Sequence, residues 1–285
     1  RYYMGTLILM HATNIFLNWV LIFGHLGMPA LGVTGAGIAS AVSTAVGLAI
    51  YVYLGLRQAH PNGFLHGLPP ASETKAIIRL SLPTGIQQLF FSTGFLVMFW
   101  IIGQVGTREL AAASVLINVM LVAVLPGMGL GMAASTLVGQ ALGRGEPDDA
   151  ALWGWDVVKV AMVMLAVLGM PLWVNPDPIL GVFIHDASTL DVARVPAMLI
   201  GALMALEAVG LVLMHALLGA GDARRVMVVA VGTQWLLFLP AAYLAGPVMG
   251  FGLTTIWILQ ASYRALQTGV FIGFWRKRQW AGIAV

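Results

Sequence analysis

The chain has 285 residues, of which 60% are hydrophobic and 9% are charged. Soluble globular domains carry roughly 25% charged residues, so this composition excludes an ordinary soluble protein and predicts a membrane protein. The chain has no cysteine, which excludes disulfides, thiolate metal sites and thiol catalysis. Its net charge of +3 comes without a basic stripe of interleaved aromatic residues, so we expect no nucleic-acid partner.

Long apolar stretches predict an all-α polytopic membrane protein with about eight transmembrane helices, because each stretch reaches the ~20 residues that cross a bilayer. The stretches are continuous, whereas the strands of a membrane β-barrel are short and alternate in polarity. Proline inside a span interrupts the helix, and Pro83, Pro126 and Pro240 lie inside spans. The predicted spans are residues 4–24, 31–56, 77–104, 110–141, 152–174, 193–219, 226–247 and 252–275.

Basic residues predict the orientation of these spans, because short loops rich in Lys and Arg stay in the cytoplasm. One side of the predicted membrane carries only Arg108 and Arg194. We therefore expect an integral plasma membrane protein, of a bacterial inner membrane, with both termini of this segment cytoplasmic. The other side carries Arg1, Arg57, Lys75, Arg79, Arg144, Lys159, Arg224, Arg225, Arg276, Lys277 and Arg278.

A loop rich in proline and glycine divides the chain into parts. Residues 57–76 contain Pro61, Pro69 and Pro70 together with two glycines, a composition that breaks helices. We take this segment as a cytoplasmic loop between two lobes. Residues 1–56 then form the last two helices of one lobe, and residues 77–285 form a second lobe of six helices.

Glu207 is the strongest candidate for a functional residue. It lies in the apolar run 198–218, whose other polar member is His215. A charge at the centre of a bilayer costs a few kcal/mol on insertion scales, so membrane proteins keep such residues mainly for binding or transport. The alternative is a neutral glutamic acid that only holds helices together by hydrogen bonds. We favour the functional interpretation and assign Glu207 to cation coupling.

Other polar side chains inside the spans are candidates for a wet central cavity. Gln260, Arg264 and Gln267 have helical spacing and share one face of the last span. For any single Asn or Gln the competing interpretation is a helix–helix hydrogen bond, worth about 0.6 kcal/mol. Arg264 is expected to face the interior and either pair with a carbonyl or Glu207, or hold a substrate group. The cavity or substrate candidates are Gln87, Gln88, Asn118, Gln234, Gln260 and Arg264.

Five segments resemble the multidrug and toxic compound extrusion (MATE) family. Residues 14–24 (NIFLNWVLIFG) and 29–39 (PALGVTGAGIA) are similar to its fifth and sixth helices, and residues 82–88 (LPTGIQQ) to the start of its seventh. Residues 138–145 (VGQALGRG) and 215–224 (HALLGAGDAR) look like the elbows after its eighth and tenth helices. Their order and spacing extend over nearly the whole chain.

The resemblance implies helices five to twelve of a twelve-helix, two-lobed antiporter. Such proteins export cationic or amphipathic compounds in exchange for protons or sodium ions. Glu207 matches the place of an acidic cation-site residue on the tenth helix of several members. Some members carry a second glutamate on the seventh helix, where this chain has Phe91, so a two-acid site in this lobe is in doubt.

Three other functions remain as alternatives to a secondary antiporter. A flippase for lipid-linked precursors, from the same superfamily, needs a more cationic cavity, and only Arg264 supplies such a charge. An intramembrane enzyme needs an acid/base pair or a metal set, and a channel needs a ring of matched polar groups. We therefore expect no enzyme, no metal, no cofactor beyond the coupling ion, and small-molecule substrates as partners of a monomer in the lipid bilayer.

Overall fold

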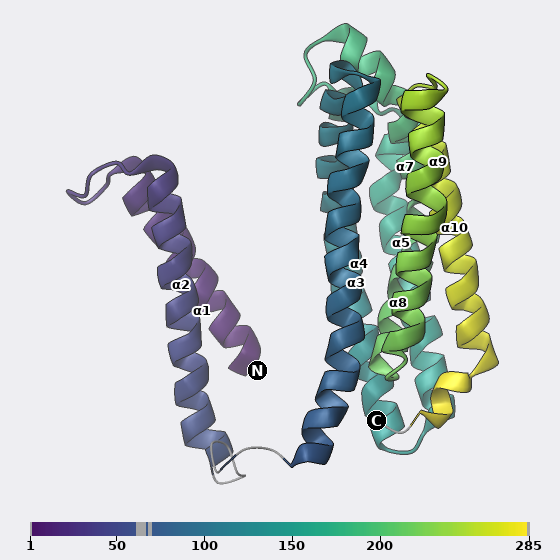
Figure 1. The fold of residues 1–285 in the computed structure, drawn as a ribbon. Helices are drawn as coiled ribbons and strands as arrows, with labels where there is room; N and C mark the ends of the chain where they lie inside the picture. Colours follow the sequence, from purple (N-terminus) through teal and green to yellow (C-terminus); the bar gives the residue numbers. More distant parts are fainter. Residues whose placement is uncertain (1, 61–66, 68–69, 284–285) are drawn as a thin grey trace. The chain divides into compact units, whose positions relative to one another are not determined.

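The computed structural model describes residues 2–60, 67 and 70–283, and in that part of the chain every regular element is a helix (Figure 1). The prediction of an all-α polytopic membrane protein is confirmed. The long helices are α1 (Tyr2–Phe23), α2 (Gly32–Leu54), α3 (Ala71–Val105), α4 (Thr107–Gly143), α5 (Pro147–Val174), α7 (Ala187–Gly219) and α10 (Leu253–Lys277). An eighth helical run joins α8 (Ala223–Gly232), η3 (Thr233–Phe238), α9 (Leu239–Tyr243) and η4 (Leu244–Val248), and the short elements are η1 (Gly55–Ala59), α6 (Asp177–Leu180) and η5 (Gln279–Gly282).

The described helices include 6 that are long and apolar enough to cross a membrane, or 7 if the bent helix α4 counts as one span. The helix outside this set is α10, although the sequence predicts a span at residues 252–275. Its stripe of Gln260, Arg264 and Gln267 lowers its hydropathy. A polar stripe is tolerated within a bilayer only where it faces protein or water. The stripe of α10 should therefore face the neighbouring helices or a water-filled cavity.

Contacts divide the chain into two compact units, Arg1–Glu73 and Thr74–Val285. The division falls inside the predicted loop 57–76, but that loop is shorter than the sequence suggests. Helix α3 begins at Ala71, directly after Pro70. Proline is common at helix starts, because the first backbone N–H groups of a helix have no partner within it and the missing N–H of proline costs nothing there. The remaining loop positions 61–66, 68 and 69 lie outside the described residues.

The first unit is an antiparallel pair of helices, α1 and α2. The two backbones approach closely at Gly35, where an added Cβ would lie 2.5 Å from the carbonyl oxygen of Leu21. Small residues permit such contacts between membrane helices. The polar face of α1 forms hydrogen bonds within this unit. Asn14 Nδ2 donates to Ser40 Oγ of α2 at 3.4 Å, and Asn18 Nδ2 donates to Asn14 Oδ1 at 3.0 Å.

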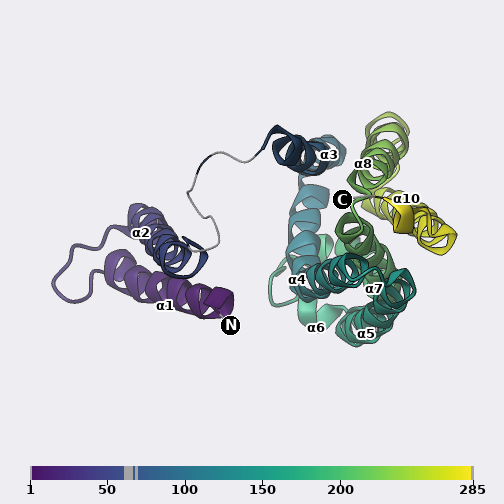
Figure 2. The same ribbon diagram turned by 90° about the horizontal axis from the view of Figure 1, so that it is seen from below.

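The second unit is built around α7. Viewed end-on, α7 is surrounded by α4, α5, α8 and α10 (Figure 2), and it packs against each of them. Glycines make this position possible, since Gly201 meets α5, Gly210 meets α10 and Gly219 meets α4 so closely that a Cβ would collide with the neighbour. The core of the unit therefore lies along α7, the helix that carries Glu207.

Prolines account for the irregular helices of this unit. Helix α4 bends by 43° between residues 122 and 124, one turn before Pro126, where the proline ring displaces the preceding carbonyl groups. Pro240 lies in α9, between the π-helical segments η3 and η4, and such wide turns accommodate a helix that has lost a hydrogen bond. Helix α3 runs on through Pro83.

The start of α7 is fixed by Asp186, whose carboxylate accepts hydrogen bonds from Ser188 Oγ at 2.6 Å, Thr189 Oγ1 at 2.7 Å and the Thr189 amide at 2.9 Å. These bonds lower the pKa of Asp186 from 3.8 to about 2. Because the folded pKa lies below the unfolded value, the cap stabilises the protein above pH 3.8 and is lost as the pH falls toward 2.

We expect Asp186→Ala to lower the thermal unfolding midpoint of the full-length protein at neutral pH, because α7 loses its N-cap. The difference from wild type should shrink as the pH falls toward 2, where the wild-type cap is itself protonated. Asp191→Ala, one turn further along and with a side chain 71% exposed, is the control. A deficit independent of pH, or an equal deficit for the control, would contradict the role of the cap.

Candidate functional site

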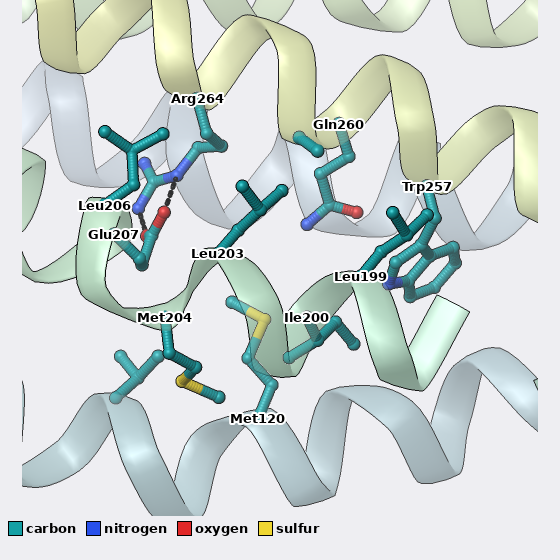
Figure 3. A pocket seen from close by; sticks show the side chains of 12 residues that line it. Met120, Leu199, Ile200, Leu203, Met204, Leu206, Glu207, Trp257, Gln260 and Arg264 are labelled. Carbon is teal, nitrogen blue, oxygen red and sulfur yellow. Dashed lines mark hydrogen bonds and ion pairs between the residues drawn. The ribbon is translucent and has the colours of Figure 1, made fainter. Parts of the chain in front are cut away.

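Glu207 lies in the middle of α7 and points toward α10 (Figure 3). Its side chain is 15% exposed, so most of its surface is covered by protein. A carboxylate in such a position must be neutralised or paired, because burial of an isolated charge costs far more than a hydrogen bond returns.

Arg264 of α10 supplies the partner charge. Its Nε donates to Glu207 Oε2 at 2.9 Å, and its Nη2 forms an ion pair with Glu207 Oε1. A guanidinium that meets both oxygens of one carboxylate is the strongest arrangement of this pair. The sequence leaves open whether Arg264 pairs with a carbonyl, with Glu207 or with a substrate, and the structure shows the pair with Glu207.

The ion pair continues into a hydrogen-bonded network that joins three helical segments. The third guanidinium nitrogen, Nη1, donates to Gln267 Oε1 at 2.8 Å. Gln267 Nε2 then donates to Thr233 Oγ1 at 2.8 Å, at the start of the π-helical segment η3. Gln267 and Thr233 are both buried, so this network holds the guanidinium in one orientation.

A cavity of about 60 Å³ lies beside the ion pair, between α4, α7 and α10. Its walls are mainly apolar, and Glu207 and Arg264 are the two charged residues that line it in the described part of the chain. This volume has room for a few water molecules, since one water needs at least ~10–15 Å³. The lining residues are Met120, Val124, Leu199, Ile200, Leu203, Met204, Leu206, Glu207, Trp257, Gln260, Ala261 and Arg264.

Two polar atoms of residues that line this cavity are buried without a hydrogen-bond partner within the described residues. They are the acceptor Oε1 of Gln260 and the donor Nε1 of Trp257. Figure 3 shows both side chains on α10, on the same side of the cavity as Arg264. Unsatisfied buried groups are rare in folded proteins and mark places where water, a ligand or a moving side chain supplies the missing bond.

The structure brings three of the predicted site residues together at this cavity, namely Glu207, Gln260 and Arg264. Gln87 lies elsewhere on α3 and donates from Nε2 to Met214 Sδ at 3.5 Å. Asn118 is exposed and donates to the Ser114 carbonyl oxygen of its own helix at 2.8 Å. The other two candidates do not line the cavity either: Gln88 is exposed on α3, and Gln234 is buried beside Gly94.

Sequence reasoning missed Trp257 and Thr233 as neighbours of the site. Trp257 precedes Gln260 by three residues, so the polar stripe of α10 could have been extended to it by helical spacing alone. Thr233 gives no such signal, because its bond to Gln267 spans 34 residues. In the residues that the structure describes, no group of three or more His, Cys, Asp or Glu side chains could hold a metal ion.

A comparison with protein families matches residues 83–244 to the MatE family. The match extends over more than half of the chain, from α3 to the end of α9 and into η4, and it includes Glu207. The chain belongs to the MatE family. The MATE resemblance seen in the sequence motifs is thereby confirmed.

Curated relatives of this chain include two proteins named probable multidrug resistance protein NorM. The one from Thermotoga maritima is 29% identical over 249 residues, which is 86% of this chain and 53% of the relative. The one from Pseudomonas aeruginosa is 31% identical over 254 residues, which is 86% of this chain and 52% of the relative. The chain thus spans about half the length of the relatives that it matches.

Solved structures with the same fold come from this family as well. A MATE protein in the straight conformation superposes with a TM-score of 0.84 at 18% identity, covering 96% of this chain and 62% of the other. A MATE family transporter of the MOP superfamily in an outward-facing conformation gives a TM-score of 0.85 at 17% identity, covering 99% and 63%. This MatE chain is therefore part of an all-α integral membrane protein.

Proposed function

We propose that this MatE chain is part of a secondary active antiporter that exports cationic or amphipathic organic compounds in exchange for protons or sodium ions. The observation that carries the proposal is Glu207, an acid in the middle of a membrane helix that lines a cavity beside a charged partner. Relatives named as multidrug resistance proteins support the same function.

The chemistry of the cavity fits a transporter better than an enzyme or a channel. Its walls are mainly apolar, with two methionines and a tryptophan that can adapt to amphipathic compounds. The charged groups form one salt bridge and offer no separate acid and base for catalysis. Glu207 is the group that can exchange one bound cation for another, which is the step that an antiporter requires.

A flippase for lipid-linked precursors is the second candidate, and Arg264 is the observation that favours it. A cationic cavity residue could hold a phosphate group. The guanidinium, however, is already bonded to Glu207, so the pair contributes no net charge to the cavity. The exporter therefore remains the better proposal.

The cellular setting follows from the same proposal. The distribution of basic residues supports cytoplasmic ends for this segment, in a bacterial inner membrane. In this orientation the cytoplasmic loops include the elbow where Arg144 forms ion pairs with Glu146 and Asp149. We propose a monomeric full-length protein that works in the bilayer with small-molecule substrates as its partners and with no nucleic acid or cofactor beyond the coupling ion.

Transport into inverted vesicles tests this function. The full-length protein is reconstituted, ethidium serves as a fluorescent organic cation, and a pH gradient and a sodium gradient are imposed separately. We expect ethidium to accumulate when one of the two gradients is present and not when both are collapsed. Vesicles without protein are the control, and the absence of gradient-driven accumulation under both conditions would overturn the antiporter.

A further inference from the structure

We propose that Arg264 is a tethered countercation that competes with the coupling cation for Glu207, and that Gln260 receives the guanidinium when it is displaced. This inference rests on the proposed antiport function. It adds a specific step to that function, because a cation binds the acid of this site tightly only after a residue of the chain itself has moved away.

The first step of the argument is occupancy. The guanidinium meets both carboxylate oxygens of Glu207, through Nε at 2.9 Å and through Nη2. A proton or a sodium ion binds through those same oxygens, and the guanidinium that engages both also neutralises the carboxylate charge, so either cation binds weakly while the ion pair is closed. Cation binding and the ion pair therefore compete for one carboxylate.

The second step is the place to which the displaced side chain can go. Gln260 lies one turn before Arg264 on the same face of α10, the spacing at which two side chains of a helix meet. Among the residues that the structure describes, its Oε1 is a buried acceptor without a partner, and both residues line the same cavity. A guanidinium that turns from Glu207 toward Gln260 moves into existing space and satisfies an acceptor that otherwise has none.

The third step is the anchor that stays in place. Nη1 of Arg264 is held by Gln267, which is in turn held by Thr233. The guanidinium can pivot about this bond without losing all of its partners. Two positions of one side chain, with a shared anchor, make a switch between an ion-free state and a cation-bound state.

Competition of this kind lowers the apparent cation affinity of Glu207. If the ion pair is closed in about 99% of molecules, the apparent dissociation constant is about 100-fold weaker than the intrinsic one. Removal of the guanidinium should therefore strengthen cation binding, whereas removal of the Gln260 acceptor should weaken it. A static salt bridge also predicts stronger cation binding after loss of the guanidinium, because a neighbouring positive charge has been removed, but it predicts no effect of Gln260.

Other ionisable groups on the packed helices do not line the cavity in the described part of the chain. His215 of α7 binds the Leu211 carbonyl oxygen through Nδ1 at 2.8 Å, and Tyr263 of α10 stacks on Phe238. The same holds for the remaining charged groups on α4, α5, α7, α8 and α10, which are Arg108, Glu109, Asp148, Asp149, Asp156, Lys159, Asp191, Arg194, Arg224, Arg225, Arg276 and Lys277.

The experiment measures cation binding through thermal unfolding of the purified full-length protein. Sodium chloride is titrated against choline chloride at constant ionic strength, and protons are titrated separately in sodium-free buffer, since a ligand that binds the folded state raises its unfolding midpoint. We expect Arg264→Gln to show a half-saturating sodium or proton concentration at least about tenfold below that of wild type. The gain should vanish in the double variant Glu207→Gln/Arg264→Gln.

Two further variants keep the test decisive if Arg264→Gln does not fold. Gln260→Met retains the ion pair but removes the second acceptor, and we expect about a threefold to tenfold higher half-saturating concentration. Arg264→Lys cannot make the two-oxygen fork and should fall between wild type and Arg264→Gln. Gln104→Met, the same type of change at an exposed position of α3, is the control and should match wild type.

Unchanged half-saturating concentrations of both cations in the Arg264 variants would overturn the competition, and unchanged values in Gln260→Met would overturn the switch to Gln260. Such a result would leave the export function standing, because ethidium transport is measured separately. Conversely, the protein could fail to export ethidium and still show the expected changes in cation binding. That result would overturn the antiport function and support the competition between Arg264 and the cation for Glu207.

Discussion

The full-length protein carrying Glu207→Gln is expected to fold and to lose gradient-driven export, down to the level of vesicles without protein. Glutamine retains the size of the side chain and a carbonyl oxygen that can accept from Arg264 Nε. It has no charge to exchange, so neither a proton nor a sodium ion can be bound and released in the transport cycle. The measurement is ethidium accumulation with each gradient in turn, at matched amounts of protein.

Stability has to be separated from mechanism in this experiment. Removing one partner of a buried ion pair costs about 3–5 kcal/mol, because the remaining charge is left uncompensated. The double variant Glu207→Gln/Arg264→Gln removes both charges and should recover thermal stability without recovering export. Asp156→Asn, in a surface ion pair with Lys159, should export normally. Export by Glu207→Gln at the wild-type rate would remove Glu207 from the mechanism.

Gly201→Ala is expected to destabilise the protein by about 1–3 kcal/mol, near the upper end of that range. A Cβ on Gly201 would lie 2.5 Å from the Trp173 nitrogen and 2.6 Å from the Gly169 carbonyl oxygen, both in the backbone of α5. Backbone atoms cannot move aside as a flexible side chain can. The added methyl group must therefore push α7 away from α5 along a contact that buries the core of the second unit.

The matched control is Gly269→Ala, the same chemical change in the middle of α10. No neighbouring atom of the described part of the chain lies within 4 Å of a Cβ at Gly269, so the substitution adds a methyl group without a clash. Alanine is favoured over glycine in a helix by roughly 0.5–1 kcal/mol, and the variant should be as stable as wild type or slightly more so. Thermal unfolding of both purified variants checks the pair. Equal unfolding midpoints would show that the contact between α5 and α7 has room for an added methyl group.

Much of the fold could be predicted from the sequence because the bilayer permits few choices. Continuous apolar runs can cross it only as helices, which is why the predicted spans match the long helices closely. The bend of α4 near Pro126 follows from the covalent geometry of proline. The prolines before Ala71 indicate a break in the helical pattern, but they do not fix the residue at which α3 begins.

The rotation of each helix about its own axis could not be predicted. A membrane helix is apolar on nearly all sides, so its sequence carries little information about which face meets protein. Asn118 and Gln88 illustrate the difficulty, because both are polar residues in apolar spans and both are exposed in the structure. Gln260 and Arg264 have the same kind of sequence signal, and they line the cavity.

For the site, the sequence alone determined that Glu207 places an ionisable group at a depth where charges are costly, and that Arg264 must face the interior. The tertiary structure alone decided that the two residues meet. They lie 57 positions apart on α7 and α10, and their pairing depends on how glycines such as Gly210 let those helices approach. Electrostatics requires a partner for a buried charge, whereas the identity of that partner depends on the packing of helices that are distant in the sequence.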